Sequence, residues 1–282
     1  MKRKKIASKV AVNLTLAILA FIWLIPIVWM VLNSFSTQTA MNTSRFFPGA
    51  YTLNNYIQLL FNPGGTARFP TWFKNTFVIA CFSCLISTLF VLMTAYAFSC
   101  CNFRDRKGIM NVAVVLNMFP GVLTMVAMYF ILQSLGLTDS HVGLILVYSA
   151  GAGLGYLICK GFFDTVPLSL REAAKLDGAS EFRVFWQIVI PMSKPIIVYT
   201  VINAFMAPWM DFVMAKLMMT SKNSDLYTVA IGLYDMLDKQ RINQYFAQFC
   251  AGCVLISIPI GILFVIMQKF YVEGVTGGSV KG

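Results

Sequence analysis

The fold of this chain is decided by residues 164–195, DTVPLSLREAAKLDGASEFRVFWQIVIPMSKP. This stretch gathers charged side chains of both signs: Asp164, Arg171, Glu172, Lys175, Asp177, Glu181, Arg183 and Lys194. The sequence on either side of it is apolar for long enough to cross about 30 Å of hydrocarbon, which takes about 20 helical residues. We therefore interpret residues 164–195, called here the 164–195 loop, as a polar loop between two membrane-spanning segments.

The composition places the chain in a membrane. Its 282 residues are 58% hydrophobic and 12% charged, and its mean hydropathy is +0.73. Soluble domains carry about 25% charged residues, roughly twice this share. The net charge of +11 does not indicate a nucleic-acid partner, because the Lys and Arg residues lie in short segments beside apolar runs, where they set membrane orientation. We predict a membrane protein surrounded by lipid, without a nucleic-acid partner.

Apolar runs predict an all-α polytopic fold with about six transmembrane helices. The expected spans cover about residues 10–32, 72–98, 109–132, 141–163, 195–219 and 245–270. Lys and Arg are more frequent in the segments on the side of the two termini than in the opposite loops, so both termini are predicted to be cytoplasmic. The 164–195 loop is then cytoplasmic, and the loops 33–71 and 220–244 face outside. We divide the chain into a first span with its outer loop (1–71), a core (72–270) and a Gly-rich cytoplasmic tail (271–282).

Local signals divide the 164–195 loop into two short helices. Ser169 and Glu172 have the spacing of a capping box, in which each side chain bonds the backbone N–H of the other residue. Gly178 predicts a helix stop in the left-handed conformation, and Ser180 can cap a second helix. Two interpretations stay open. The loop is either an amphipathic connector, with Glu172 serving only its cap, or a small-residue corner that docks into a partner protein.

Other candidate sites are few. The pairs Cys81/Cys84 and Cys250/Cys253 have metal-ligand spacing, but they lie in apolar runs, so we interpret them as packing residues and predict no metal site. The sequence contains no GxxxxGK[ST] phosphate-binding motif, so energy from ATP has to come from another subunit. No acid–base constellation converges, and we predict that the chain is not an enzyme.

Asp211 is an acidic residue well inside an apolar run. A charge at mid-membrane costs about 2.5–3.5 kcal/mol on insertion scales, so its default interpretation is functional. Asp211 and Trp209 are candidates for a sugar path, with the indole offering a ring face. The alternatives are a structural hydrogen bond between Asp211 and a neighbouring span, or pairing with Lys216.

The sequence EAAKLDGASEFRVFWQIVIP, residues 172–191, resembles the EAA loop of permease subunits of ATP-binding-cassette (ABC) importers. It has Glu-Ala-Ala, a Gly four residues after the second Ala, and Ile and Pro before the next span. Further stretches are similar to carbohydrate-importer permeases: KNTFVIA (74–80), AYAFS (95–99), NMFPG (117–121), GLTDS (136–140) and KGFFDTVP (160–167). APWMDF (207–212) and the ending EGVTGGSVKG (273–282) are similar to the G-type subunit of maltose/maltodextrin importers. The resemblance covers about residues 72–282.

This resemblance implies a type I ABC-importer permease fold with a cytoplasmic coupling helix seated in a cleft of an ATPase subunit. The implied ATPase-coupling residues are Glu172, Ala173, Ala174, Asp177, Gly178, Ala179 and Pro191. In the maltose-type G subunit of the family, the C-terminal tail lies between the two ATPase subunits, which implies further contacts at Gly277, Gly278 and Lys281. Sugar contacts in this class lie largely in the F-type partner.

The implied complex contains a homologous F-type permease, an ATPase homodimer that binds ATP and Mg, and an extracytoplasmic sugar-binding protein. The chain itself is expected to bind no cofactor. The implied function is import of maltose or malto-oligosaccharides across the cell membrane by alternating access. An importer of a raffinose-type or multiple-sugar substrate or of glycerol phosphate stays open. An ion-driven secondary transporter is disfavoured, because one intramembrane acid and no visible repeat speak against it, and so is a membrane-embedded enzyme.

Overall fold

The computed structural model describes residues 2–41, 45–61, 68–151, 155–221 and 223–277. Over these residues the chain is helical, and the only β-type pairing is an isolated antiparallel bridge between Ser36 and Tyr51. The all-α prediction is confirmed for the part of the chain that the structure describes.

The chain forms two compact units, Met1–Pro70 with Gly232–Ile258, and Thr71–Ile231 with Pro259–Gly282. The first unit holds α1 (Lys2–Ser34), α2 (Asn54–Phe61) and the start of α14 (Ile242–Gly277). In this unit the Asn55 side chain donates hydrogen bonds to one backbone oxygen at the end of α1, Ser34 O at 3.0 Å, and to one just after it, Ser36 O at 2.8 Å. These bonds fix the course of the chain where it leaves α1.

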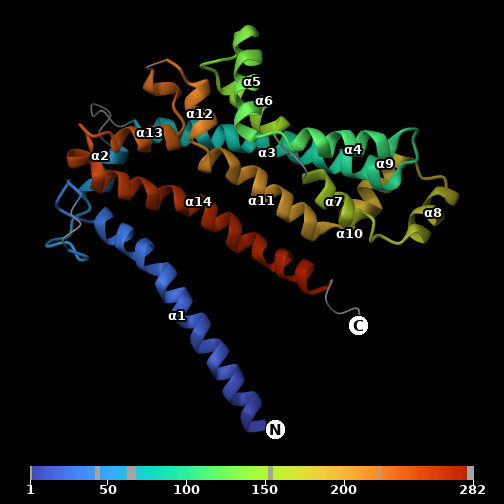
Figure 1. Cartoon of the computed structure of the whole chain (residues 1–282), viewed down its shortest axis with the longest axis horizontal. Coiled ribbons are helices and arrows are strands. Elements are labelled where there is room, and N and C mark those ends of the chain that lie inside the picture. The colour runs from blue at the N-terminus through green and yellow to red at the C-terminus, as the bar shows by residue number, and fades with distance from the viewer. Residues whose placement is uncertain (1, 42–44, 62–67, 152–154, 222, 278–282) are drawn as a thin grey trace. The chain divides into compact units, whose positions relative to one another are not determined.

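The second unit contains the 164–195 loop and the helices around it (Figure 1). These elements are α3 (Phe69–Cys100), α4 (Arg106–Asn117), α5 (Gly121–Ser134), α6 (His141–Ala150), α7 (Gly155–Phe163), α8 (Leu168–Leu176), α9 (Glu181–Val184), a π-helical turn (Phe185–Val189), α10 (Ile190–Met192), α11 (Lys194–Met210), α12 (Val213–Met218) and the start of α13 (Val229–Met236). Figure 1 shows α8 and α9 near one end of α3.

The described helices offer up to six membrane crossings. Three segments are long and apolar enough by themselves, namely Lys9–Ser34, Phe69–Cys100 and Ile242–Gln268. Three pairs reach this length only together and are bent by more than 40°. In one of them Glu181–Met192 meets α11 at 87°, so it cannot continue the direction of α11, and we treat α11 as the crossing segment.

Three expected spans are bent or broken rather than continuous, and the one over 141–163 consists of α6 and α7, which meet at 45°. The span over 109–132 consists of α4 and α5, which meet at 97°. Pro120 separates them because it has no N–H for a helical bond and disfavours helical backbone in the residue before it. The span over 195–219 ends as α11 at Met210, and α12 begins at Val213.

A buried cluster packs the 164–195 loop against its neighbours. It joins α3, α7 and the segment from α9 to α11: Val91, Leu92, Ala95, Tyr96, Phe98, Tyr156, Cys159, Phe163, Val184, Phe185, Val189 and Ile196. Because apolar side chains from all these helices share one core, the loop is held in place by packing as well as by its polar contacts.

Candidate functional site

The helix α8 is the short exposed helix of the 164–195 loop. Pro167 precedes its first residue, and no side chain forms a capping hydrogen bond there. The predicted capping box is therefore wrong, because the helix begins one residue before Ser169 and the Ser169 hydroxyl does not lie at the cap. Pro167 starts the helix instead, since its ring already fixes φ near a helical value, here −55°.

The C-terminal end of α8 is a Schellman motif around Gly178. The Ala179 N–H donates to Ala174 O at 2.9 Å, and the Gly178 N–H donates to Lys175 O at 3.0 Å. Gly178 has φ +81°, in the left-handed region that favours glycine. The predicted left-handed stop at Gly178 is confirmed. Ala174 and Ala179 both pack against the buried cluster, which supplies the apolar contact typical of this motif.

Ser180 begins the next helix, as the sequence predicts. Its Oγ accepts a hydrogen bond from the Arg183 N–H at 3.3 Å. The helical course then passes through the π-helical turn Phe185–Val189 and ends at Met192, beyond Pro191. Pro191 has no N–H to donate to the preceding turn, which accounts for the irregular helix directly before it.

The implied ATPase-coupling residues divide into two groups. The exposed ones are Glu172, Ala173, Asp177, Gly178 and Pro191. Ala174 and Ala179 are half-buried against the core, so their small size serves the corner itself in this structure. The leucines of α8 were not among the predicted coupling residues, although Leu176 is 89% exposed and Leu168 and Leu170 are also exposed. Apolar residues inside a charged loop were the available signal.

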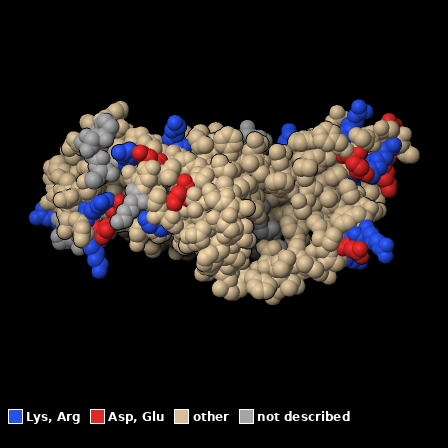
Figure 2. Space-filling model, turned by 90° about the horizontal axis from the view of Figure 1, so that it is seen from above, with Lys and Arg blue, Asp and Glu red and all other residues tan. Residues whose placement is uncertain are grey.

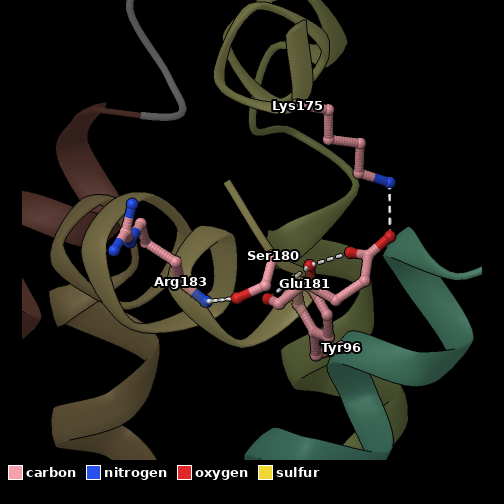
Figure 3. Close-up of polar contacts among 5 residues, drawn as sticks. All are labelled: Tyr96, Lys175, Ser180, Glu181 and Arg183. Atoms are coloured by element: carbon pink, nitrogen blue, oxygen red, sulfur yellow. Dashed lines mark hydrogen bonds and ion pairs between the residues drawn. The ribbon is translucent and has the colours of Figure 1, made fainter. Parts of the chain in front are cut away.

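Glu181 connects the second short helix to α8 and to α3. Figure 3 shows its carboxylate between Tyr96 and Lys175. The Tyr96 hydroxyl donates to Glu181 Oε2 at 2.6 Å, and the Lys175 ammonium forms an ion pair with Oε1. The hydrogen bond from Lys175, followed by that from Tyr96, lowers the pKa of Glu181 below its ordinary value. Glu181 is therefore held as a carboxylate that bridges two helices.

Asp164 makes the corresponding contact at the start of the loop. Ser99 Oγ donates to Asp164 Oδ1 and Lys160 Nζ donates to Oδ2, each at 2.6 Å. Burial raises the pKa of Asp164, but the bonds from Lys160 and Ser99 outweigh this effect and lower it overall. The carboxylates on both flanks of α8 thus accept hydrogen bonds from α3.

Charged side chains gather around α8 and α9 in the surface view (Figure 2), although this is not the only charged surface on that face. On the face shown in Figure 2, blue and red side chains crowd the end that carries α8 and α9. The surface of the neighbouring span region is almost wholly uncharged in the same view. This pattern fits a polar surface beside an apolar, lipid-facing one.

Asp211 lies in the break between α11 and α12. The Tyr148 hydroxyl of α6 donates to Asp211 Oδ2 at 2.8 Å, and the Met214 N–H donates to Oδ1 at 3.1 Å. Of the two structural alternatives predicted for Asp211, the structure shows the hydrogen bond to a neighbouring span. Lys216, the other predicted partner, lies over an aromatic ring. Trp209 is only 3% exposed, so its role and that of Asp211 in a sugar path stay predictions.

A cavity of about 330 Å³ lies among α3, α6, α7 and α11. Its polar lining includes Ser87, Tyr148, Tyr199, Thr200 and Asn203. Polar side chains at membrane depth mark substrate paths more often than lipid-facing surfaces. Sequence reasoning missed this group, because its members come from three apolar runs and no spacing rule connects them.

The predicted C-terminal tail begins within a helix. Because α14 extends to Gly277, the part of the tail that the structure describes, residues 271–277, is helical. Adding a residue to an existing helix needs no new nucleus, which favours this extension beyond the span. Of the predicted tail contacts, Gly278 and Lys281 lie outside the described residues.

Several helices that are long and apolar enough to cross a membrane, together with an exposed helix anchored to them, define a polytopic membrane protein. The family model for the binding-protein-dependent transport system inner membrane component matches residues 97–277, and the chain belongs to this family. A bacterial ABC transporter that imports the acidic polysaccharide alginate has the same fold, with a TM-score of 0.78, 21% identity and coverage of 93% of this chain and 95% of that one. A second alginate transporter structure, in complex with an alginate pentasaccharide-bound periplasmic protein, has a TM-score of 0.64 at 13% identity, covering 92% of this chain and 93% of that one. The predicted ABC-importer permease fold is confirmed.

Several relatives are sugar permeases. The galactooligosaccharides transport system permease protein GanQ of Bacillus subtilis is 34% identical over 95% of this chain and 94% of its own length. The maltodextrin transport system permease protein MalD of Streptococcus pneumoniae is 36% identical over 76% of each chain. The maltose/maltodextrin transport system permease protein MalG of Vibrio vulnificus is 34% identical over 75% of this chain and 72% of that protein. The resemblance to the MalG-like class of carbohydrate ABC permeases is confirmed, and the chain is a transport component.

Proposed function

We propose that this permease imports malto-oligosaccharides by alternating access and that an ATPase subunit drives it through α8. The observation that carries this proposal is the corner from α8 to Gly178, which is exposed on its outer side and packed against the spans on its inner side. A rigid projection of this kind can pass the motion of a partner to the helices beneath it.

The outer side of α8 has the chemistry of a docking surface. Glu172 is exposed and makes no hydrogen bond or ion pair with any residue that the structure describes. Leu176, Leu168 and Leu170 present apolar surface next to it. An ATPase cleft that offers a cation to Glu172 and an apolar wall to Leu176 would complement this surface.

The proposed complex contains an F-type permease, an ATPase homodimer that binds ATP and Mg, and an extracytoplasmic sugar-binding protein. Both termini and α8 lie in the cytoplasm in this proposal, and the loops 33–71 and 220–244 receive the binding protein. The excess of Lys and Arg on the side of the termini supports this orientation. The alginate importer bound to a periplasmic protein supports the architecture by its fold.

The cargo proposed first is a malto-oligosaccharide, because maltodextrin permeases recur among the relatives. A galacto-oligosaccharide is the second candidate, since GanQ is similar over nearly the whole chain. The cavity lined by Tyr148, Tyr199 and Asn203 offers hydroxyl, amide and ring surfaces that suit either sugar. Asn203→Leu is expected to lower sugar uptake without lowering the amount of assembled complex.

Docking is tested with Leu176→Asp and Glu172→Ala, each in the complete transporter. Leu176→Asp places an unpaired charge in the proposed interface. The amount of copurified ATPase is therefore expected to fall by about tenfold or more. Leu135→Asp is the matched control, because Leu135 is also exposed but lies in the turn between α5 and α6. Full copurification and transport in both α8 variants would contradict docking at α8. Uptake of maltotriose compared with a galactotriose then decides between the two cargoes.

A further inference from the structure

The inner end of α3 is fastened to both flanks of α8. Tyr96 donates to Glu181, which follows α8, and Ser99 donates to Asp164, which precedes it. Tyr96 and Ser99 are three residues apart and lie on one face of α3. Both acceptors are carboxylates, whose hydrogen bonds are stronger than those between neutral groups. Displacement of α8 away from α3 therefore pulls on α3 through these two contacts.

The opposite end of α3 is fastened to the segment 224–229. The Trp72 indole N–H donates to Ser224 O at 2.7 Å. The Asn75 amide donates to Asp225 O at 2.7 Å and to Tyr227 O at 3.0 Å, and both oxygens belong to the backbone. Thr76 Oγ1 accepts the Val229 N–H at 2.8 Å. Three side chains of α3 at this end thus hold, by four hydrogen bonds, a loop on the other side of the bilayer from α8.

The two attachments are separated by the thickness of a membrane. Thr76 and Tyr96 are twenty residues apart, which is about 30 Å at 1.5 Å per residue and equals the hydrocarbon core. From Thr71 to Cys100 the helix contains neither Pro nor Gly, whereas the crossings formed by α4/α5 and by α11/α12 are interrupted. An unbroken helix that is buried along one side transmits displacement along its axis with little bending.

We propose that α3 is the rigid element that links the outer segment 224–229 to α8, so that docking of the sugar-binding protein outside is passed to the ATPase through this one helix. This inference rests on the proposed function, in which α8 contacts the ATPase and the 220–244 loop faces outside. Tyr96, Ser99 and Thr76 are its positioning residues, because they act through the segments that they hold and touch no substrate.

The test uses one substitution at each end, and each removes a single oxygen with little change of shape. Tyr96→Phe deletes the donor to Glu181, and Thr76→Val deletes the acceptor of the Val229 N–H. Tyr129→Phe and Thr88→Val are the matched controls, since neither hydroxyl bonds the 224–229 segment or the 164–195 loop among the described residues. The complete complex in lipid nanodiscs is assayed for copurified ATPase and for stimulation of ATP hydrolysis by sugar-loaded binding protein.

Each end variant is expected to copurify with as much ATPase as the wild type does. The stimulation of ATP hydrolysis by sugar-loaded binding protein is expected to fall about fivefold, which is the lower end of the usual range of coupling between sites. The double variant distinguishes one shared link from two local effects. Changes about 30 Å apart normally add, which here predicts an about 25-fold loss. If both contacts serve the same helix, the double variant loses no more than about fivefold, because either change already interrupts the link.

Two results would overturn the proposal. One is wild-type stimulation of ATP hydrolysis in Thr76→Val and also in both inner variants, Tyr96→Phe and Ser99→Ala. Ser99→Ala is the milder inner variant and is used alone if Tyr96→Phe does not insert into the membrane. The other is an additive loss in the double variant. Failure of the proposed function is visible separately, because Leu176→Asp would then leave ATPase copurification unchanged whatever the end variants do.

Discussion

The hydroxyl of Tyr148 donates a 2.8 Å hydrogen bond to the carboxylate of Asp211, and this joins α6 to the break after α11. The second oxygen of the same carboxylate accepts the Met214 N–H at the start of α12. One acidic side chain therefore ends one helix, begins the next and holds a third. These donors account for a carboxylate in an apolar stretch, because a buried acceptor without partners is strongly unfavourable.

Substitutions of Asp211 separate this structural role from a role in the sugar path. Asp211→Ala leaves the Tyr148 hydroxyl and the Met214 N–H without their acceptor, so the free energy of unfolding is expected to fall by about 1–3 kcal/mol. Asp211→Asn keeps a side-chain oxygen and is expected to lose less. Thermal unfolding of the purified complex measures both. A strong loss of sugar uptake in Asp211→Asn at wild-type stability would show that the charge itself serves transport.

Gly178→Ala is expected to destabilise the corner after α8 by about 1 kcal/mol. The reason is conformational, because Gly178 has φ +81° while a Cβ at this position would meet nothing within 4 Å. Gly161→Ala is the matched control, since its Cβ also meets open space but its backbone lies within the regular helix α7. The expected order in thermal unfolding is Gly178→Ala below wild type, with Gly161→Ala equal to wild type or above it.

Gly143→Ala is expected to be far more damaging than Gly252→Ala. A Cβ on Gly143 would lie 2.2 Å from the backbone oxygen of Leu137, so the turn before α6 has to move. A Cβ on Gly252 would lie 2.5 Å from Leu233 Cδ2, the end of a side chain that can rotate away. The yield of folded protein in membranes measures the difference. Equal yields would show that the α5–α6 turn adapts more readily than its backbone contact indicates.

The contribution of Glu181 to stability is expected to disappear in acid. Its pKa in the folded chain is lowered from the ordinary 4.5, so the folded state binds the proton less readily than the unfolded state. The stabilisation is then complete above the ordinary pKa and is lost as the pH falls through the lowered folded value. The difference in unfolding temperature between wild type and Glu181→Gln should be constant near neutral pH and shrink below about pH 4.5. If this difference in unfolding temperature stayed the same down to the lowest pH at which the complex remains intact, the stabilising role given to the Glu181 carboxylate would be contradicted.

Local chemistry made the central part of the candidate site predictable. The stop at Gly178 and the cap at Ser180 follow from residues within a few positions of each other, and the structure confirms both. The capping box failed although its spacing was right, because with Pro167 at the cap the helix begins two residues earlier than the box requires. Neighbouring local signals competed, and the ring of proline constrained the backbone more strongly than a serine hydroxyl did.

The sequence by itself determined that the chain is helical, that it lies in a membrane and that its polar loop turns at Gly178. These properties depend on composition, on the length of apolar runs and on contacts between near neighbours. Only the tertiary structure decided that Ala174 and Ala179 face inward, and that Tyr96 and Ser99 hold the two flanks of α8. Those contacts join residues 85 and 65 positions apart, and such pairings arise from the packing of whole helices, which no local pattern encodes.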